Sequence, residues 1–113
     1  MATKANLVLD QGTTFSSTIE LLDENDEALD ITAYTARGQI RKHYSSSNAV
    51  NFTTALSNGS LVISLTATQT ANIVAGRYVY DLELVNSSNV VTRILEGIVT
   101  VTPEVTRWQL KLN

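Results

Sequence analysis

Residues 76–85 read Gly-Arg-Tyr-Val-Tyr-Asp-Leu-Glu-Leu-Val and show the clearest alternation in the chain. Tyr78, Tyr80, Leu82 and Leu84 fall on one side, with Arg, Val, Asp and Glu between and before them. Successive side chains of a β-strand point to opposite faces of the sheet. The pattern therefore predicts a half-buried strand whose inner face carries the two tyrosines and the two leucines.

The segments on either side of this strand predict how it is connected. Residues 66–73 form the only plausible helix, about two turns long, with Thr66 or Thr68 as its N-cap. Residues 86–89, Asn-Ser-Ser-Asn, predict a hairpin turn. In immunoglobulin-like sandwiches a tyrosine early in such a strand bonds back to the corner before it. Tyr78 or Tyr80 could fill that role, or both could be plain core residues.

The rest of the chain predicts further short strands separated by polar turns. The acidic run at residues 23–27 reads as a turn, residues 29–31 as a short edge segment and residues 57–59 as a tight turn. Strands are expected at residues 6–9, 13–22, 35–42, 51–56, 60–65 and 90–101. About seven strands with regular turn signals predict an all-β, immunoglobulin-like β-sandwich with one short helix at a strand-to-strand corner.

The predicted core follows from the inward positions of these strands. Its members are large and, apart from two tyrosines, apolar. They are Phe15, Ile19, Leu21, Ile40, Leu61, Ile63, Leu65, Tyr78, Tyr80, Leu82, Leu84, Val99 and Val101.

Composition bounds the classes of function. The chain has 113 residues, enough for one domain, and no cysteine, so it has neither a disulfide nor a thiolate metal site. Its net charge of −3, with both signs interspersed, argues against a nucleic-acid partner. Residues 1–20 lack a continuous apolar run, so we expect no signal peptide, and no stretch is long enough to predict a membrane span.

The candidates for chemistry are weak. His43 is the only histidine and has no carboxylate or cysteine at catalytic or metal spacing, so we expect a solvated loop residue. The acidic run at 23–27 has Ala28 where a calcium loop needs glycine, so a hairpin tip is the better interpretation. Arg37, Arg41 and Lys42 could meet phosphate or an acidic partner, but such residues more often mark the solvent side of an edge strand. We expect no enzyme activity, no cofactor and no metal.

The C-terminal segment is different. We divide the chain into a β-sandwich at residues 1–106 and a tail at residues 107–113. Trp108, Leu110 and Leu112 alternate with polar residues in that tail. The tail could pair with the domain's own sheet beside residues 6–9, or dock on a neighbouring subunit by strand addition with Trp108 as the anchor.

Four stretches resemble small tail and baseplate proteins of tailed phages. Residues 29–41, L-D-I-T-A-Y-T-A-R-G-Q-I-R, are similar to a stretch of that family. Residues 10–15 resemble its opening strand, residues 64–83 its helical corner and residues 96–106 its closing strand. Together they span about residues 10–106, which are similar to the immunoglobulin-like domain that begins the upper baseplate proteins.

The resemblance implies a function as well as a fold. It implies a non-enzymatic structural protein of the virion, made in the host cytoplasm, that serves as an adaptor or decoration module in the tail, baseplate or neck. Its partners would be other virion proteins or further copies of itself, with no nucleic acid and no membrane. The family has Asp-Gly where this chain has Asp26 and Glu27, so that hairpin is expected to be looser. The alternative is a carbohydrate- or host-receptor-binding module, with Tyr34 and Tyr44 as its loop aromatics.

Overall fold

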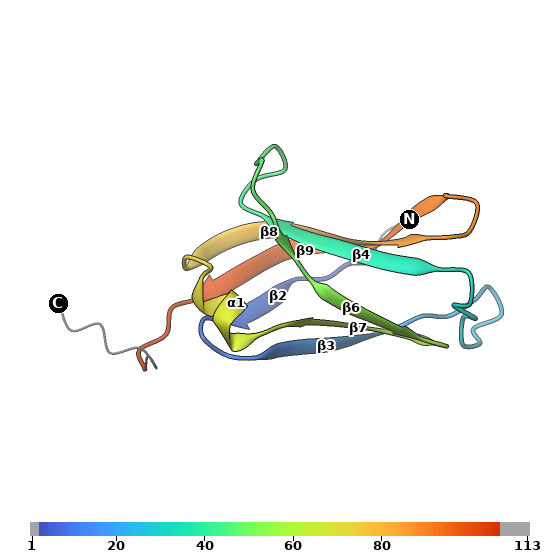
Figure 1. The fold of residues 1–113 in the computed structure, drawn as a ribbon, viewed down its shortest axis with the longest axis horizontal. Coiled ribbons are helices and arrows are strands. Elements are labelled where there is room, and N and C mark those ends of the chain that lie inside the picture. The colour runs from blue at the N-terminus through green and yellow to red at the C-terminus, as the bar shows by residue number, and fades with distance from the viewer. Residues whose placement is uncertain (1–2, 107–113) are drawn as a thin grey trace.

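The computed structural model describes residues 3–106 and shows an all-β sandwich of two sheets with one short helix (Figure 1). The larger sheet has six strands in the order β1-β9-β8-β4-β5, and β2 also pairs with β9. Its strands are β1 (Thr3–Lys4), β2 (Leu7–Asp10), β4 (Thr35–Arg41), β5 (Val50–Asn51), β8 (Gly76–Val85) and β9 (Val91–Thr102).

The smaller sheet has three antiparallel strands in the order β3-β7-β6. They are β3 (Phe15–Glu20), β7 (Ser60–Leu65) and β6 (Thr53–Ser57). One expected strand, at residues 51–56, changes sheets at Phe52: β5 pairs with β4, whereas β6 pairs with β7. Figure 1 shows β6 descending from the layer of β4 to that of β7, so it closes one side of the sandwich.

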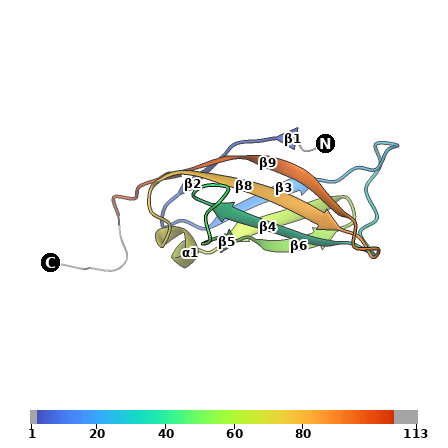
Figure 2. The ribbon, with the colours of Figure 1, turned by 90° about the horizontal axis from the view of Figure 1, so that it is seen from above.

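The β8 strand occupies the bounds that the alternation predicts and lies between β4 and β9 in the larger sheet (Figure 2). The β1 and β2 strands run parallel to β9, at different heights along it. Pairing of β8 with β9 shifts register between Leu82 and Glu83, opposite Leu95 and Arg93. Ile94 is the extra residue of this bulge, which interrupts the strict alternation of β9.

The helix α1 (Ala67–Ala71) begins with a capping box. The Thr66 hydroxyl accepts a hydrogen bond from the backbone N–H of Gln69 at 3.1 Å, and the Gln69 side chain accepts one from the Thr66 N–H at 2.8 Å. These contacts satisfy two donors that a helix start would otherwise leave free. Of the two expected N-caps, Thr66 is therefore the one used.

The core lies between the two sheets, largely as predicted. Ten of the thirteen expected residues are buried, while Phe15, Ile19 and Tyr78 pack against the core and remain half-buried. Those three predictions were too strong, because the residues lie on an edge strand or at the corner. Five further residues are buried that the strand pattern did not predict: Leu9, Gly38, Phe52, Thr70 and Ile73.

The loops follow the expected turn chemistry with one exception. Asp23 accepts hydrogen bonds from the N–H groups of Asn25 and Glu27, so the acidic run closes on its own backbone. Residues 29–31 form no strand; instead Leu29 donates to the Leu21 carbonyl and accepts from the N–H of Gly59. Within residues 3–106 no helix is long and apolar enough to cross a membrane.

Candidate functional site

The predicted docking residues Trp108, Leu110 and Leu112 lie outside the described residues. The candidate site is therefore sought on the sandwich itself. Three surfaces stand out: the end that carries α1, the outer face of the larger sheet, and the side where β2 and β3 form sheet edges.

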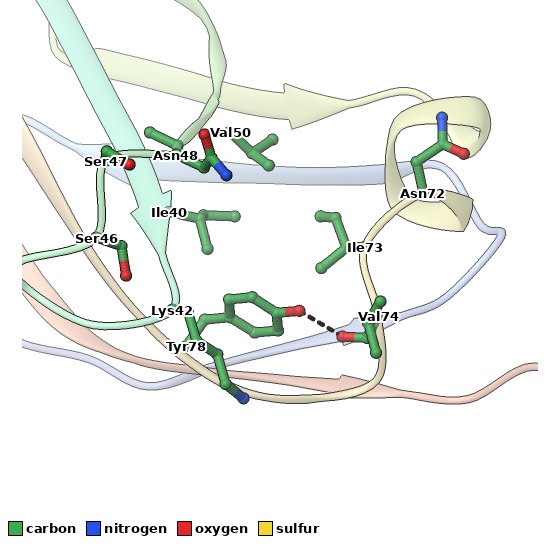
Figure 3. A pocket seen from close by; sticks show the side chains of 11 residues that line it. Ile40, Lys42, Ser46, Ser47, Asn48, Val50, Asn72, Ile73, Val74 and Tyr78 are labelled. Atoms are coloured by element: carbon green, nitrogen blue, oxygen red, sulfur yellow. Dashed lines mark hydrogen bonds between the residues drawn. The ribbon is translucent and has the colours of Figure 1, made fainter.

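The end of the sandwich near α1 holds a hollow of about 530 Å³ (Figure 3). Figure 3 shows Ile40, Ile73 and Tyr78 around it, and the Tyr78 hydroxyl donates to the carbonyl oxygen of Val74 at 2.6 Å. The Lys42 ammonium donates to the Arg77 carbonyl at 2.9 Å and lies 4.8 Å from the centre of the Tyr78 ring. The polar groups of Tyr78 and Lys42 at this hollow are thus engaged by the protein itself, which suits a rigid corner better than a ligand site.

Gln11 joins three parts of this end. Its amide nitrogen donates to the Ile73 carbonyl at 2.9 Å, and its amide oxygen accepts from the N–H of Glu104 at 3.1 Å. The buried Thr70 hydroxyl adds a bond to the Thr13 carbonyl at 2.7 Å. The turn between β2 and β3, the α1 corner and the segment after β9 are therefore held together.

The outer face of the larger sheet is polar at its centre. Arg37 and Glu83 form an ion pair at 2.7 Å, and Arg93 and Asp81 form one at 3.3 Å. Burial raises the pKa of Asp81 above its ordinary value, and Glu83 adds to the effect while Arg93 opposes it. A hollow of about 300 Å³ covers this area, and the exposed Tyr44 contributes to its lining.

The basic residues singled out from the sequence do not form a free cluster. Arg37 is paired with Glu83, and Lys42 donates to the Arg77 carbonyl. Arg41 donates to the Ser46 carbonyl and to the side-chain oxygen of Gln39. A solvent-facing surface fits these contacts better than a phosphate site. The expected edge strand is wrong, because β4 lies between β8 and the two-residue β5.

His43 is an exposed loop residue. Its backbone N–H donates to the Ser46 hydroxyl. Among the residues that the structure describes, no group of three or more histidines or acidic residues is placed to hold a metal ion.

The two loop aromatics lie at opposite ends of one strand. Tyr34 precedes β4 and packs half-buried against the core, whereas Tyr44 follows β4 and is 83% exposed. The seven residues of β4 separate them by about 23 Å at the usual rise of a strand. The two tyrosines therefore belong to different surfaces: Tyr44 lines the polar hollow, whereas the half-buried Tyr34 lines a separate groove beside the end of β3.

Apolar side chains gather on the outer face of the larger sheet near β2. Val8 is 62% exposed and Ile98 is 38% exposed. Val8 lies opposite Thr100 and Ile98 lies opposite Val79, which places all three apolar residues on one face. We call Val8, Val79 and Ile98 the apolar strip; it borders the β2 edge, which pairs on its outer side with no strand in residues 3–106.

Comparison with known proteins supports the fold and nothing finer. No family model matches the chain, and no curated protein sequence matches it. Among solved structures it is similar to an internalin-like protein of Listeria monocytogenes, with a TM-score of 0.51, 16% identity and 89% of this chain covered. A family 123 glycoside hydrolase from Clostridium perfringens is also similar, with a TM-score of 0.42, 13% identity and 90% covered. The chain spans only 28% and 23% of the lengths of these two proteins.

Proposed function

We propose that this chain is a non-enzymatic structural component of a tailed-phage virion, an adaptor or decoration module of the tail, baseplate or neck. It acts by burying apolar surface against neighbouring proteins. The apolar strip of Val8, Val79 and Ile98 beside the open β2 edge is the observation that carries the proposal. A sheet edge offers backbone groups for pairing, and exposed apolar side chains next to it supply affinity.

The resemblance to phage tail and baseplate proteins supports the location in the virion. The stretches that carry it include β4, α1 and β8 of an immunoglobulin-like sandwich, the fold that the resemblance implies. The partners we propose are other virion proteins or further copies of this chain, with neither nucleic acid nor membrane. The polar face of the larger sheet supports the non-enzymatic part of the proposal, because Arg37 is paired with Glu83 and Arg93 with Asp81.

Mass spectrometry of purified phage particles from a host that carries the gene tests the location. We expect the chain in the particles in multiple copies per particle. Val8→Lys or Ile98→Lys should reduce its incorporation, because a buried charge without a partner is costly. Thr53→Lys, on an exposed position of β6, is the matched control and should leave incorporation unchanged. Absence of the wild-type chain from intact particles would falsify the proposal.

A second candidate function is a carbohydrate- or host-receptor-binding module. The exposed Tyr44 ring beside the polar hollow favours it, because sugar and small-ligand sites combine an aromatic surface with convergent polar groups. A glycan array with the wild-type protein and with Tyr44→Ala separates the two functions. Binding that the substitution abolishes would favour the module, and no binding at all would favour the structural role.

A further inference from the structure

The smaller sheet ends on a strand with no outer neighbour. Constant-type immunoglobulin domains place four strands, A, B, E and D, in one sheet. Here β3, β7 and β6 correspond to B, E and D, while β1 and β2 pair with β9 in the other sheet. The position beside β3 that strand A would take is therefore open in the part of the chain that the structure describes.

The backbone of β3 is ready to pair along this edge. Leu21 donates its N–H towards β7, to the Gly59 carbonyl at 2.8 Å. Ladder bonds of an antiparallel strand alternate between its two sides, so the N–H and C=O groups of Ser16 and Thr18 point to the open edge. An added strand would find donors and acceptors there at a regular spacing.

An apolar groove lies beside the far end of this edge. It has a volume of about 480 Å³ and separates the end of β3 from the start of β9. Ile19 and Leu21 line one wall, and Ile94 and Leu95 line the other. The groove lies at the β9 bulge, and the connection between β3 and β4 completes its lining with Leu29 and Tyr34.

The tail has the pattern that this groove and edge require. Trp108, Leu110 and Leu112 alternate with Gln109 and Lys111. As a strand it would turn three large apolar side chains to the groove and two polar ones to water. Its lysine is also complementary to Glu20, which is exposed at the rim of the groove.

The reach of the chain indicates which copy supplies the strand. Glu104 is bonded to Gln11, before the start of β3, whereas the groove lies past its other end, about 20 Å away along six residues. Trp108 follows Glu104 by four residues and can extend about 14 Å from it. The tail of the same copy would also have to run parallel to β3, whereas the strand beside B in an immunoglobulin sheet runs antiparallel.

We propose that residues 107–112 of one copy add as an antiparallel strand to the β3 edge of a second copy, with Trp108 in the groove between β3 and β9. Reciprocal exchange gives a two-fold symmetric dimer, in which the same surface of each copy is used. The inference rests on the proposed function in that it names a second copy as the partner of the tail.

Light scattering on the purified full chain tests the exchange, and we expect a dimer. Deletion of residues 107–113 should give a monomer. Thr18→Pro removes an N–H that faces the open edge without removing a bond to β7, and should weaken the dimer roughly tenfold. Thr18→Val keeps that N–H and is the matched control.

Cross-linking shows whether the tail binds β3 of its own copy or of a second copy, and it does not depend on the proline variant. The chain has no cysteine, so Thr18→Cys and Gln109→Cys introduce one thiol each. Mixing the two single variants, one of them tagged, should give a disulfide-linked pair that contains both. A wild-type protein that is a monomer at all concentrations would overturn the inference. So would an internal disulfide in a protein that carries both substitutions, if the mixture of single variants gives no linked pair.

The two proposals fail separately. A monomeric chain that is still found in purified particles would overturn the strand exchange and leave the virion function standing. A dimer that never enters particles would overturn the virion function and leave the exchange standing.

Discussion

The Tyr78 hydroxyl donates a hydrogen bond to the backbone carbonyl oxygen of Val74 at 2.6 Å, four residues earlier in the chain. Tyr78 is the third residue of β8, and Val74 lies in the corner that follows α1. This is the tyrosine contact typical of immunoglobulin-like sandwiches. Of the two tyrosines that the sequence offered for this role, Tyr78 fills it, while the Tyr80 hydroxyl donates to the Ala5 carbonyl at 2.5 Å.

Tyr78→Phe removes the corner bond and keeps the ring. We expect a loss of about 1 kcal/mol in the free energy of unfolding, since the Val74 carbonyl is exposed enough to bond water instead. Urea unfolding of both proteins, with the slope of the transition unchanged, measures this difference. Equal midpoints would show that the bond contributes nothing to stability.

Tyr80→Phe should act on a different part of the molecule. Tyr80 is buried, and its hydroxyl bonds the Ala5 carbonyl, which helps to tie the N-terminal segment to the centre of the larger sheet. We expect faster amide hydrogen exchange at Ala5, whose N–H bonds the Glu96 carbonyl, and little change around α1. Faster exchange around α1 alone would contradict this assignment.

Local patterns in the sequence predict where strands begin and end. Contacts between residues far apart in the chain decide which strands pair and which side chains are buried, and no local pattern predicts these. β7 and β8 have the predicted bounds, because each combines strict alternation with a turn or cap at its ends. The parallel pairing of β2 with β9 joins residues more than ninety positions apart, and nothing in residues 6–9 specifies that partner. Phe52 becomes core only because the chain changes sheets there.

The same limit applies to the candidate sites. Thr70 reads as an ordinary helix residue, yet it is fully buried because its hydroxyl reaches the Thr13 carbonyl from 57 positions away. Tyr34 and Tyr44 are similar loop aromatics in the sequence. Their places at the two ends of β4 leave Tyr34 half-buried against the core and Tyr44 exposed. The open β3 edge follows from which sheet receives β1 and β2.

The N-cap of α1 offers a matched pair of variants. Thr66→Ala should destabilise the protein by about 1 kcal/mol, because it removes the hydroxyl that accepts from the Gln69 N–H. Thr68→Ala, at an exposed position inside the helix, should have little effect, since alanine is a better helix former than threonine. Thermal unfolding followed by circular dichroism measures both. The reverse order of the two losses would mean that the helix begins later than the structure shows.

Gly38→Ala tests the packing between β4 and β8. A methyl group at Gly38 would overlap the Leu82 side chain and lie 2.9 Å from the Asp81 carbonyl oxygen. We expect a loss of about 1–3 kcal/mol from overpacking. Thr35→Ala, exposed on the same strand, is the control and should be nearly neutral. A Gly38→Ala protein as stable as the wild type would mean that β4 and β8 are less tightly packed than they are here.

Asp81→Asn tests the electrostatics of the polar face. Burial holds the pKa of the Asp81 carboxyl above its ordinary value of 3.8, with Glu83 adding to the effect. The folded protein therefore binds this proton more tightly than the unfolded chain does. The resulting stability is fully present below pH 3.8 and is lost as the pH rises through the folded-state pKa.

The asparagine variant has no such titration. The stability of the wild type relative to Asp81→Asn should therefore fall as the pH rises from about 3.8 through the higher folded-state pKa of Asp81, and then level off. Urea unfolding of the two proteins across this range gives the difference directly. A rise with pH would mean that the ion pair with Arg93, at 3.3 Å, outweighs the cost of burying the carboxylate.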